Sequence, residues 1–266
     1  MIRNILVPLC REPEIDIAFQ HAIEIAERVG AHLIIAVAAA VEREDVTAEL
    51  PGLEPSPVEK AVGEEPGWPK VEGEEQRVPD IAAAAVSECE ERRIARRVIV
   101  TRGSLVGRVI ELSKLADLLV ACAIGRTEQT NARALWRLAM AASCPCLVCG
   151  VRKRNLRRMA AYYDGSAVGA RALRAACELA AGLNMRMSIT VSGKNRLSVQ
   201  QQMAEGRMVA VAYNVEHDVE AVVGLRPEEF VKLAEEAGAD VIAGPRVKGF
   251  VKAALTSGSA PVLVGD

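Results

Sequence analysis

The sequence predicts two tandem α/β domains, each built on a parallel β-sheet with helices on both faces. Residues 157–191 restate residues 3–37 at a constant offset, and both copies have the pattern strand, polar turn, helix, strand. Strands and helices keep alternating after each copy, which calls for parallel strands joined by right-handed crossovers. The composition agrees, because 50% of the residues are apolar but only 3% are aromatic. Such a core of Ala, Val, Leu and Ile suits strands buried on both faces under closely packed helices.

The chain divides into two units of ordinary domain size. Its 266 residues allow a first domain at 1–150 and a second at 157–266, joined by a basic connector at 151–156. The connector is too short to act as a flexible spacer and has neither Pro nor Gly. We therefore expect the two halves to pack against each other.

The first half begins with the repeated unit and continues through further strands and helices. We expect strands at 2–9, 32–40, 97–101, 117–124 and 146–149, and helices at 16–29, 82–92, 103–115 and 131–142. Gly30 stands where a left-handed residue would end the first helix. His21 and His32 have no second ligand at metal spacing, so we interpret both as structural.

The second half follows the same order. We expect strands at 159–163, 185–192, 217–223, 240–244 and 261–265, and helices at 167–183, 198–214, 227–237 and 247–255. Asn184 takes the helix-ending position that Gly30 holds in the first half, and Asn also tolerates the left-handed conformation. Pro227 starts a helix that ends at Gly238.

Residues 42–75 interrupt the pattern of the first half. They carry five prolines and an excess of Glu over Lys and Arg, without an apolar period. Such a segment cannot bury enough surface to offset its ordering entropy, so we expect a mobile acidic insertion. It is either a tolerated surface insertion or a lid or partner-docking segment, for which Leu50, Leu53 and Trp68 would serve as apolar anchors.

Charge and cysteine content narrow the class of protein. The net charge of −2 gives no overall field that favours nucleic acid or an acidic membrane. No apolar run approaches the roughly 20 residues that span a bilayer, and we see no signal peptide, so we expect a cytoplasmic protein.

Cys144, Cys146 and Cys149 form a candidate metal cluster. However, three positions along a strand turn Cys146 and Cys149 to opposite faces, and no fourth ligand is near. We expect buried thiols rather than a metal or redox site.

Short motifs mark the strands of the chain. Ile-Leu-Val-Pro stands at 5–8, and two motifs recur in both halves: Ala-Asp before an apolar run at 116–117 and 239–240, and Pro-x-Leu-Val at 145–148 and 261–264. By these motifs each half resembles a universal stress protein domain, over nearly the whole chain outside the insertion. The resemblance implies a Rossmann-like five-stranded sheet in each half, with strand order 3-2-1-4-5. It also implies that the last strands, 146–150 and 261–265, join the halves into a pseudo-dimer.

Many members of that family bind ATP. The resemblance assigns the adenosine to an Asp after the first strand, and the phosphates to G-x2-G-x9-G-(S/T) after the fourth. In the first half these positions hold Cys10, then Cys122, Gly125 and the pair Leu135 and Trp136. Only one glycine is present, and the bulky side chains hinder an approach of phosphate to the backbone. We expect no ATP binding in this half.

The second half keeps more of the pattern. Its first turn, Asp164-Gly165-Ser166, matches the family, but 244–249 leads directly into a short helix, so most of the phosphate loop is missing. Gly258-Ser259 is better interpreted as the turn into the last strand. The candidate residues for a nucleotide or small ligand are Asp164, Gly165, Ser166, Val191, Gly244, Arg246 and Gly249. The other interpretation of the first turn is an ordinary helix cap, with Ser166 or Asp164 as N-cap.

These observations favour a non-catalytic tandem universal stress protein, a stress-response or regulatory module that acts through protein or small-ligand contacts. The phosphate loops are degenerate, and the sequence offers no nucleophile–base pair. We expect no cofactor and no metal. The alternative is an adenine-nucleotide sensor or weak ATPase that binds ATP or AMP in the second-half cleft. A flavin- or redox-linked carrier has only the cysteine content in its favour. A further homodimer and a protein partner docked on the acidic insertion both stay open.

Overall fold

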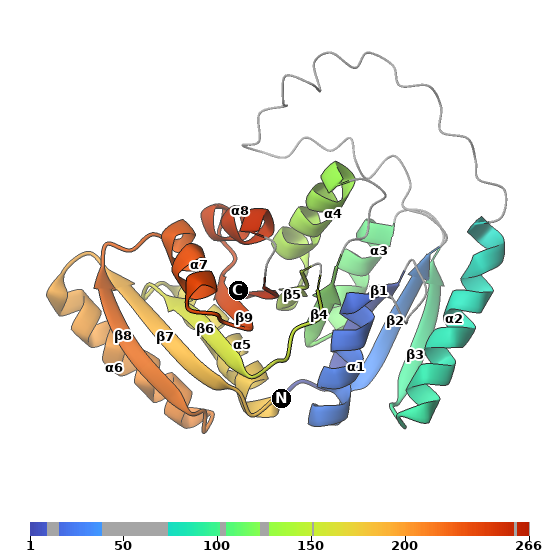
Figure 1. Ribbon diagram of the computed structural model, residues 1–266, viewed down its shortest axis with the longest axis horizontal. Coiled ribbons are helices and arrows are strands. Elements are labelled where there is room, and N and C mark those ends of the chain that lie inside the picture. Colours follow the sequence, from blue (N-terminus) through green and yellow to red (C-terminus); the bar gives the residue numbers. More distant parts are fainter. Residues whose placement is uncertain are drawn as a thin grey trace, which may run out of the picture.

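The computed structural model describes residues 1–9, 16–38, 74–101, 105–122, 128–150, 152–257 and 260–265. Its strands form one ten-stranded sheet in the order β3-β2-β1-β4-β5-β10-β9-β6-β7-β8 (Figure 1). Helices cover both faces of this sheet. In each half the strand order is the expected 3-2-1-4-5, so the predicted fold class is confirmed.

The first half supplies one side of the sheet, and its five strands are parallel. The strands are β1 (Asn4–Leu9), β2 (His32–Ala38), β3 (Arg96–Thr101), β4 (Leu118–Ala121) and β5 (Cys146–Val148). The helices are α1 (Ile17–Val29), α2 (Glu74–Glu91), α3 (Leu105–Leu112), the 3₁₀ turn η3 (Ser113–Leu115) and α4 (Glu128–Ala141). Gly30 has a φ of 70° and ends α1 as expected.

The second half repeats the arrangement, again with parallel strands. The strands are β6 (Arg158–Tyr163), β7 (Arg186–Gly193), β8 (His217–Val223), β9 (Val241–Pro245) and β10 (Val262–Gly265). The helices are α5 (Ala167–Gly182), α6 (Arg196–Ala212), α7 (Pro227–Glu236) and α8 (Lys248–Ser257). Asn184 has a φ of 46° and Gly238 a φ of 70°, in agreement with their expected helix-ending positions.

The two halves meet at the seam between β5 and β10. These strands pair antiparallel, with Leu147 opposite Leu263, which confirms the pairing of the last strands. On one face α4 packs against α8 across the seam (Figure 1). On the other face Gly182 of α5 leaves no room for a larger side chain, because a Cβ there would approach Val29 of α1 to 2.8 Å. The halves therefore pack through their sheet and through both helical layers.

Two arginines reinforce this seam by reaching from one half to the other. Arg28, in the last turn of α1, donates to the carbonyls of Leu156 in the connector and Leu183 in the second half. Arg246, after β9, donates to the carbonyls of Ala142 and Cys144 in the first half. Carbonyls at the ends of helices α5 and α4 lack partners within the helix, and each guanidinium satisfies one of them.

The core consists of two hydrophobic clusters, one on each face of the sheet. One lies under α1, α2, α5 and α6, and the other under α3, α4, α7 and α8. Both contain residues of both halves, so the domain boundaries at 150 and 157 stay a prediction. Cys149 belongs to the first cluster and Cys146 to the second, which confirms that their side chains point to opposite faces. Burial raises the pKa of Cys146 to about 12, so its thiol is neutral near pH 7.

Helix α2 begins earlier than the sequence predicted. It starts at Glu74 rather than near residue 82, and Pro79 lies inside it. Val78, Ile81, Ala85 and Cys89 are all buried, so packing at helical spacing carries the helix through the proline. The predicted insertion 42–75 lies outside the described residues, except that its last two residues form the start of α2.

A helix and a strand of the first half end at other residues than the sequence predicted. The helix expected at 103–115 ends at Leu112 and tightens into η3, where the hydroxyl of Ser113 donates to the carbonyl of Ile110 at 2.6 Å. The strand expected at 117–124 covers only Leu118–Ala121.

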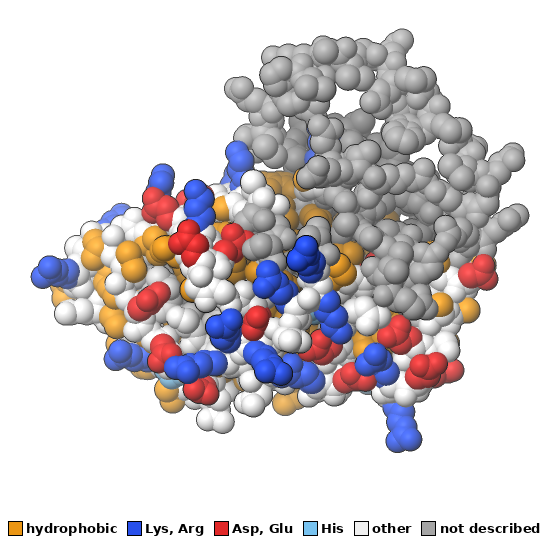
Figure 2. Space-filling model, in the orientation of Figure 1, with side chains coloured by type: hydrophobic (Ala, Val, Ile, Leu, Met, Phe, Trp, Pro, Cys, Tyr) orange, Lys and Arg blue, Asp and Glu red, His pale blue; other side chains and the backbone are white. Residues whose placement is uncertain are grey.

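None of the described helices is long and apolar enough to cross a membrane. Figure 2 shows basic and acidic side chains interspersed across the described part of the visible face, rather than a patch of one sign. Within the described ranges, no three His, Cys, Asp or Glu side chains come together as a metal-binding group.

The two Ala-Asp motifs have a structural role that is the same in both halves. Asp117 Oδ2 accepts hydrogen bonds from the backbone N–H groups of Arg3 and Asn4, at 2.8 and 2.9 Å. Asp240 Oδ2 accepts from the backbone N–H of Arg158 at 2.9 Å in the equivalent place. Each carboxylate therefore ties the start of the fourth strand of its half to the start of the first.

We expect Asp117→Ala and Asp240→Ala each to lower the free energy of unfolding by about 0.5–1.5 kcal/mol, because each leaves strand-end N–H groups to water. Urea denaturation followed by circular dichroism measures this. Asp218→Ala is the matched control, since Asp218 forms an ion pair with Arg186 at the surface. Effects no larger than that of the control would contradict the capping role.

Candidate functional site

The candidate site lies at the carboxyl ends of β7, β6 and β9 in the second half. Tyr163 is in register with Val191, and Ala161 is in register with Ala243. The turn after β6 therefore lies beside the segment that follows β9. The chain order reverses between β6 and β9, which is where open α/β sheets usually bind ligands.

The turn Asp164-Gly165-Ser166 is organised as a helix cap. Ser166 Oγ accepts from the backbone N–H of Gly169 at 2.9 Å, which confirms Ser166 as the N-cap of α5. Asp164 Oδ1 accepts from the backbone N–H of Ser166 at 3.0 Å. A Cβ on Gly169 would clash with Asp164 Oδ1, so the carboxylate is folded over the first turn of α5. Both polar side chains of this turn are thus engaged with their own backbone.

A side chain from α6 lies across the same turn. The amide Nε2 of Gln202 donates to the carbonyl of Asp164 at 3.1 Å. Gly165 has a φ of +74°, and a Cβ there would clash with Gln202. The close approach of Gln202 and the positive φ both explain why glycine stands at this position.

The end of β9 and the first turn of α8 are covered by the protein's own side chains. A Cβ on Gly244 would clash with the ring of Phe250, which is fully buried. The carboxylate of Glu228 on α7 lies so close to Gly249 that a Cβ there would clash with it. Gly249 is in the first turn of α8, and the N-terminal end of a helix attracts phosphate. Arg246 is engaged with the first-half carbonyls, so its charge is directed to the seam.

The structure does not bring all candidate residues together. Val191 belongs to the cluster under α5 and α6, whereas Gly244 faces Phe250 in the cluster on the opposite face. Two hydroxyls meet at the carbonyl of Leu225, which precedes α7: Tyr162 donates to it at 3.0 Å, and Ser192 donates to it at 2.7 Å. Burial raises the pKa of Tyr162, so the hydroxyl stays protonated as a donor near pH 7.

The corresponding positions of the first half hold no phosphate-binding group where the structure describes them. Cys10 and Gly125 lie outside the described residues. Cys122 is buried, and its thiol donates to Asp16 Oδ1 at 3.3 Å. Leu135 and Trp136 are in the middle of α4, where the backbone N–H groups already serve the helix and Trp136 packs in the core.

Comparison with solved structures establishes the fold. A search of protein-family models and a search of curated proteins found no match. A universal stress protein from Archaeoglobus fulgidus DSM 4304 superimposes with a TM-score of 0.65 at 15% identity, covering 99% of this chain and 97% of that chain. This chain has the universal stress protein fold. A putative universal stress protein from Pseudomonas aeruginosa UCBPP-PA14 gives a TM-score of 0.60 at 17% identity, over 99% and 93% of the two chains.

The universal stress protein fold of this chain is also shared with a protein of another description. The cytoplasmic domain of a prokaryotic cation chloride cotransporter superimposes with a TM-score of 0.53 at 10% identity, covering 100% of this chain and 95% of that chain. In all three comparisons the likeness runs through both halves. At these identities it shows the fold alone, so the role of the site depends on its side chains.

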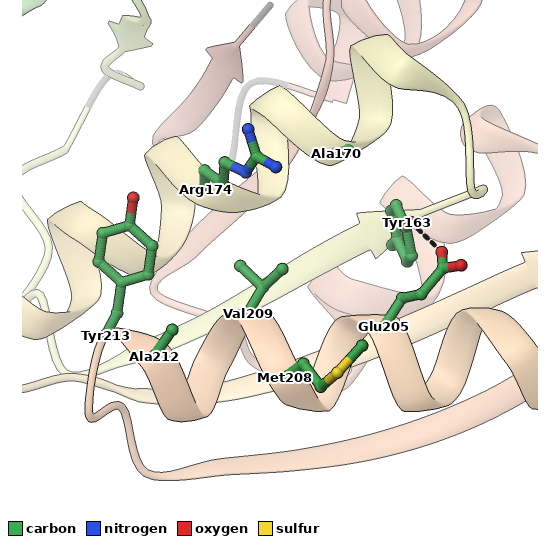
Figure 3. Close-up of a pocket in the computed structure, with 8 residues that line it drawn as sticks. All are labelled: Tyr163, Ala170, Arg174, Glu205, Met208, Val209, Ala212 and Tyr213. Carbon is green, nitrogen blue, oxygen red and sulfur yellow. Dashed lines mark hydrogen bonds between the residues drawn. The ribbon is translucent and has the colours of Figure 1, made fainter.

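The structure also has a groove that the sequence did not predict. It has a volume of about 480 Å³ and lies between α5 and α6 (Figure 3). Its lining residues are Tyr163, Ala170, Arg174, Glu205, Met208, Val209, Ala212 and Tyr213. The signal was available, because Ala170 and Arg174 are four residues apart on α5 and the α6 residues recur at helical spacing. The apolar periodicity of both helices, however, indicates their buried faces and not the groove between them.

Proposed function

We propose that this chain is a tandem universal stress protein that acts as a non-catalytic regulatory module, through protein or small-ligand contacts and not through ATP. The observation that carries this proposal is the carboxylate of Glu228 against the first turn of α8. A phosphate at that helix end would meet a like charge, and Phe250 fills the space beside Gly244. The residues present therefore do not fit the phosphates of a nucleotide.

The fold itself does not choose between functions, since it also occurs in the cytoplasmic domain of a cotransporter. The alternative is an adenine-nucleotide sensor, and its support is the turn Asp164-Gly165-Ser166 at the switch point of the sheet. For that function Asp164 would have to leave the N–H of Ser166, and Glu228 would have to leave Gly249.

Calorimetric titration with ATP, ADP and AMP, with and without Mg²⁺, tests the proposal. We expect no saturable heat up to millimolar nucleotide. Saturable micromolar binding that disappears in Asp164→Ala would establish the sensor instead.

A second pair of variants tests why nucleotide is excluded. Glu228→Gln removes the charge at α8, and we expect it to raise the affinity for ATP by about tenfold or more, equivalent to 1.4 kcal/mol. Glu236→Gln is the matched control, because Glu236 is exposed at the far end of the same helix. Equal behaviour of the two variants would mean that the Glu228 charge does not exclude the phosphate.

A further inference from the structure

We propose that the groove between α5 and α6 binds a small organic carboxylate with an apolar body, whose anionic end is held by Arg174. The groove is separate from the segment after β9, so this site does not depend on whether the strand ends accept a nucleotide. Its volume of about 480 Å³ lies in the range of small-molecule sites, about 300–1,000 Å³.

The groove exists because small side chains stand where the two helices face each other. Ala170 on α5 and Ala212 on α6 leave space that longer side chains would fill. Tyr163, the last residue of β6, forms one end of the groove with Glu205, and Tyr213 stands at the other end (Figure 3). Arg174 on α5 lies between these two ends, across from Val209 on α6 (Figure 3).

Arg174 is the lining residue that can hold an anion. Glu205 is already engaged, since its carboxylate accepts from the hydroxyl of Tyr163 at 2.7 Å and from the amide of Gln201 at 3.1 Å. Burial and this hydrogen bond raise the pKa of Tyr163, so the hydroxyl remains a donor to Glu205. Arg174 is exposed, and within the described ranges it makes no hydrogen bond or ion pair. Glu205 keeps its negative charge, but its oxygens are turned to Tyr163 and Gln201 at one end of the groove. The guanidinium of Arg174 lies away from that end (Figure 3), where it can pair with a carboxylate through two parallel hydrogen bonds.

The rest of the lining selects an apolar body. Met208 is 64% exposed on α6, so its thioether can be reached by a ligand in the groove. With Val209 and the ring of Tyr213 it forms an apolar wall of the groove. A ligand lying on this wall removes it from water, and methionine adapts readily to aliphatic and aromatic groups.

Phenylbutyrate is the test ligand, and the ¹³C-methyl resonance of Met208 is the readout, assigned through Met208→Leu. We expect a saturable shift with phenylbutyrate. The neutral phenylbutyramide should bind about tenfold or more weaker, the equivalent of one lost charged hydrogen bond, and phenylbutylamine more weakly still. Arg174→Gln should weaken phenylbutyrate to the level of the amide.

The control is Arg207→Gln, since Arg207 is exposed on α6 but does not line the groove. It should leave the affinity for phenylbutyrate unchanged, and circular dichroism verifies that both variants are folded. Three outcomes would overturn the proposal: no saturable shift at millimolar phenylbutyrate, equal binding of the amide, or equal losses in the two arginine variants. Each of these is read at Met208 and is independent of the nucleotide titration.

Discussion

Leu263→Asp should unfold both halves of the protein, and Leu263→Ala should lower the free energy of unfolding by about 2–5 kcal/mol. Leu263 lies in β10 opposite Leu147 of β5 and is almost completely buried, in a hydrophobic cluster that includes residues of both halves. A buried unpaired carboxylate costs several kcal/mol, a large part of the roughly 5–15 kcal/mol that stabilises a domain. The damage should reach the first half because the seam is part of its core.

Trp136 on α4 reports on the folding of the first half. Its fluorescence therefore tests whether a change in β10 destabilises that half, once Trp68, the other tryptophan, is replaced by Phe. We expect the fluorescence and far-UV circular dichroism of Leu263→Ala to change together in one urea transition at a lower midpoint. Val223→Asp is the control, because Val223 is 54% exposed in the edge strand β8, and its effect should stay within about 0.5 kcal/mol. A Trp136 transition unmoved by Leu263→Ala would show that the halves fold independently.

The strand–helix alternation could be predicted because it rests on local patterns. Helix ends at Gly30, Asn184 and Gly238 depend on the conformational preferences of single residues, and all three lie in the left-handed region. The start of α2 could not be predicted in this way. Pro79 is a local stop signal, but the burial of Val78 overrides it, and burial depends on the sheet that the helix meets.

The same distinction applies to the candidate site. The cap at Ser166 is local, since its partner Gly169 is three residues away, and the sequence suggested it. The surroundings of Arg246 are not local, because its carbonyl partner Ala142 is 104 residues away across the seam. Likewise, nothing near Gly249 in the sequence indicates that Glu228 lies against it. Whether a motif is open to a ligand depends on such long-range partners, and motif spacing does not contain them.

His21→Leu should stabilise the protein and flatten its dependence on pH. His21 lies on α1 and is completely buried, and neither ring nitrogen has a hydrogen-bond partner among the described residues. Burial, with a smaller contribution from the charge of Lys153, lowers the pKa of His21 to about 4. Lys153 is itself paired with Glu24 at 3.5 Å.

The sign of the pH dependence follows from the direction of that shift. In the unfolded chain the pKa of histidine is about 6.5, so the unfolded state takes up the proton first as the pH falls. The contribution of neutral His21 is complete above that value and is lost between about pH 6.5 and 4, at about 1.4 kcal/mol for each pH unit. The total loss near pH 4 is about 3 kcal/mol, which is enough to unfold a marginal domain.

Leucine fills a similar volume without nitrogen atoms to desolvate, so we expect His21→Leu to gain about 1–3 kcal/mol at pH 7. Urea denaturation at pH 7, 6 and 5 should show this gain widening as the pH falls. His32→Leu is the control, because His32 is exposed at the start of β2 and its replacement removes no buried ring. If the gain from His21→Leu were constant between pH 7 and 5, the proton would be reaching the folded ring, and the burial of His21 would not govern the acid sensitivity of this fold.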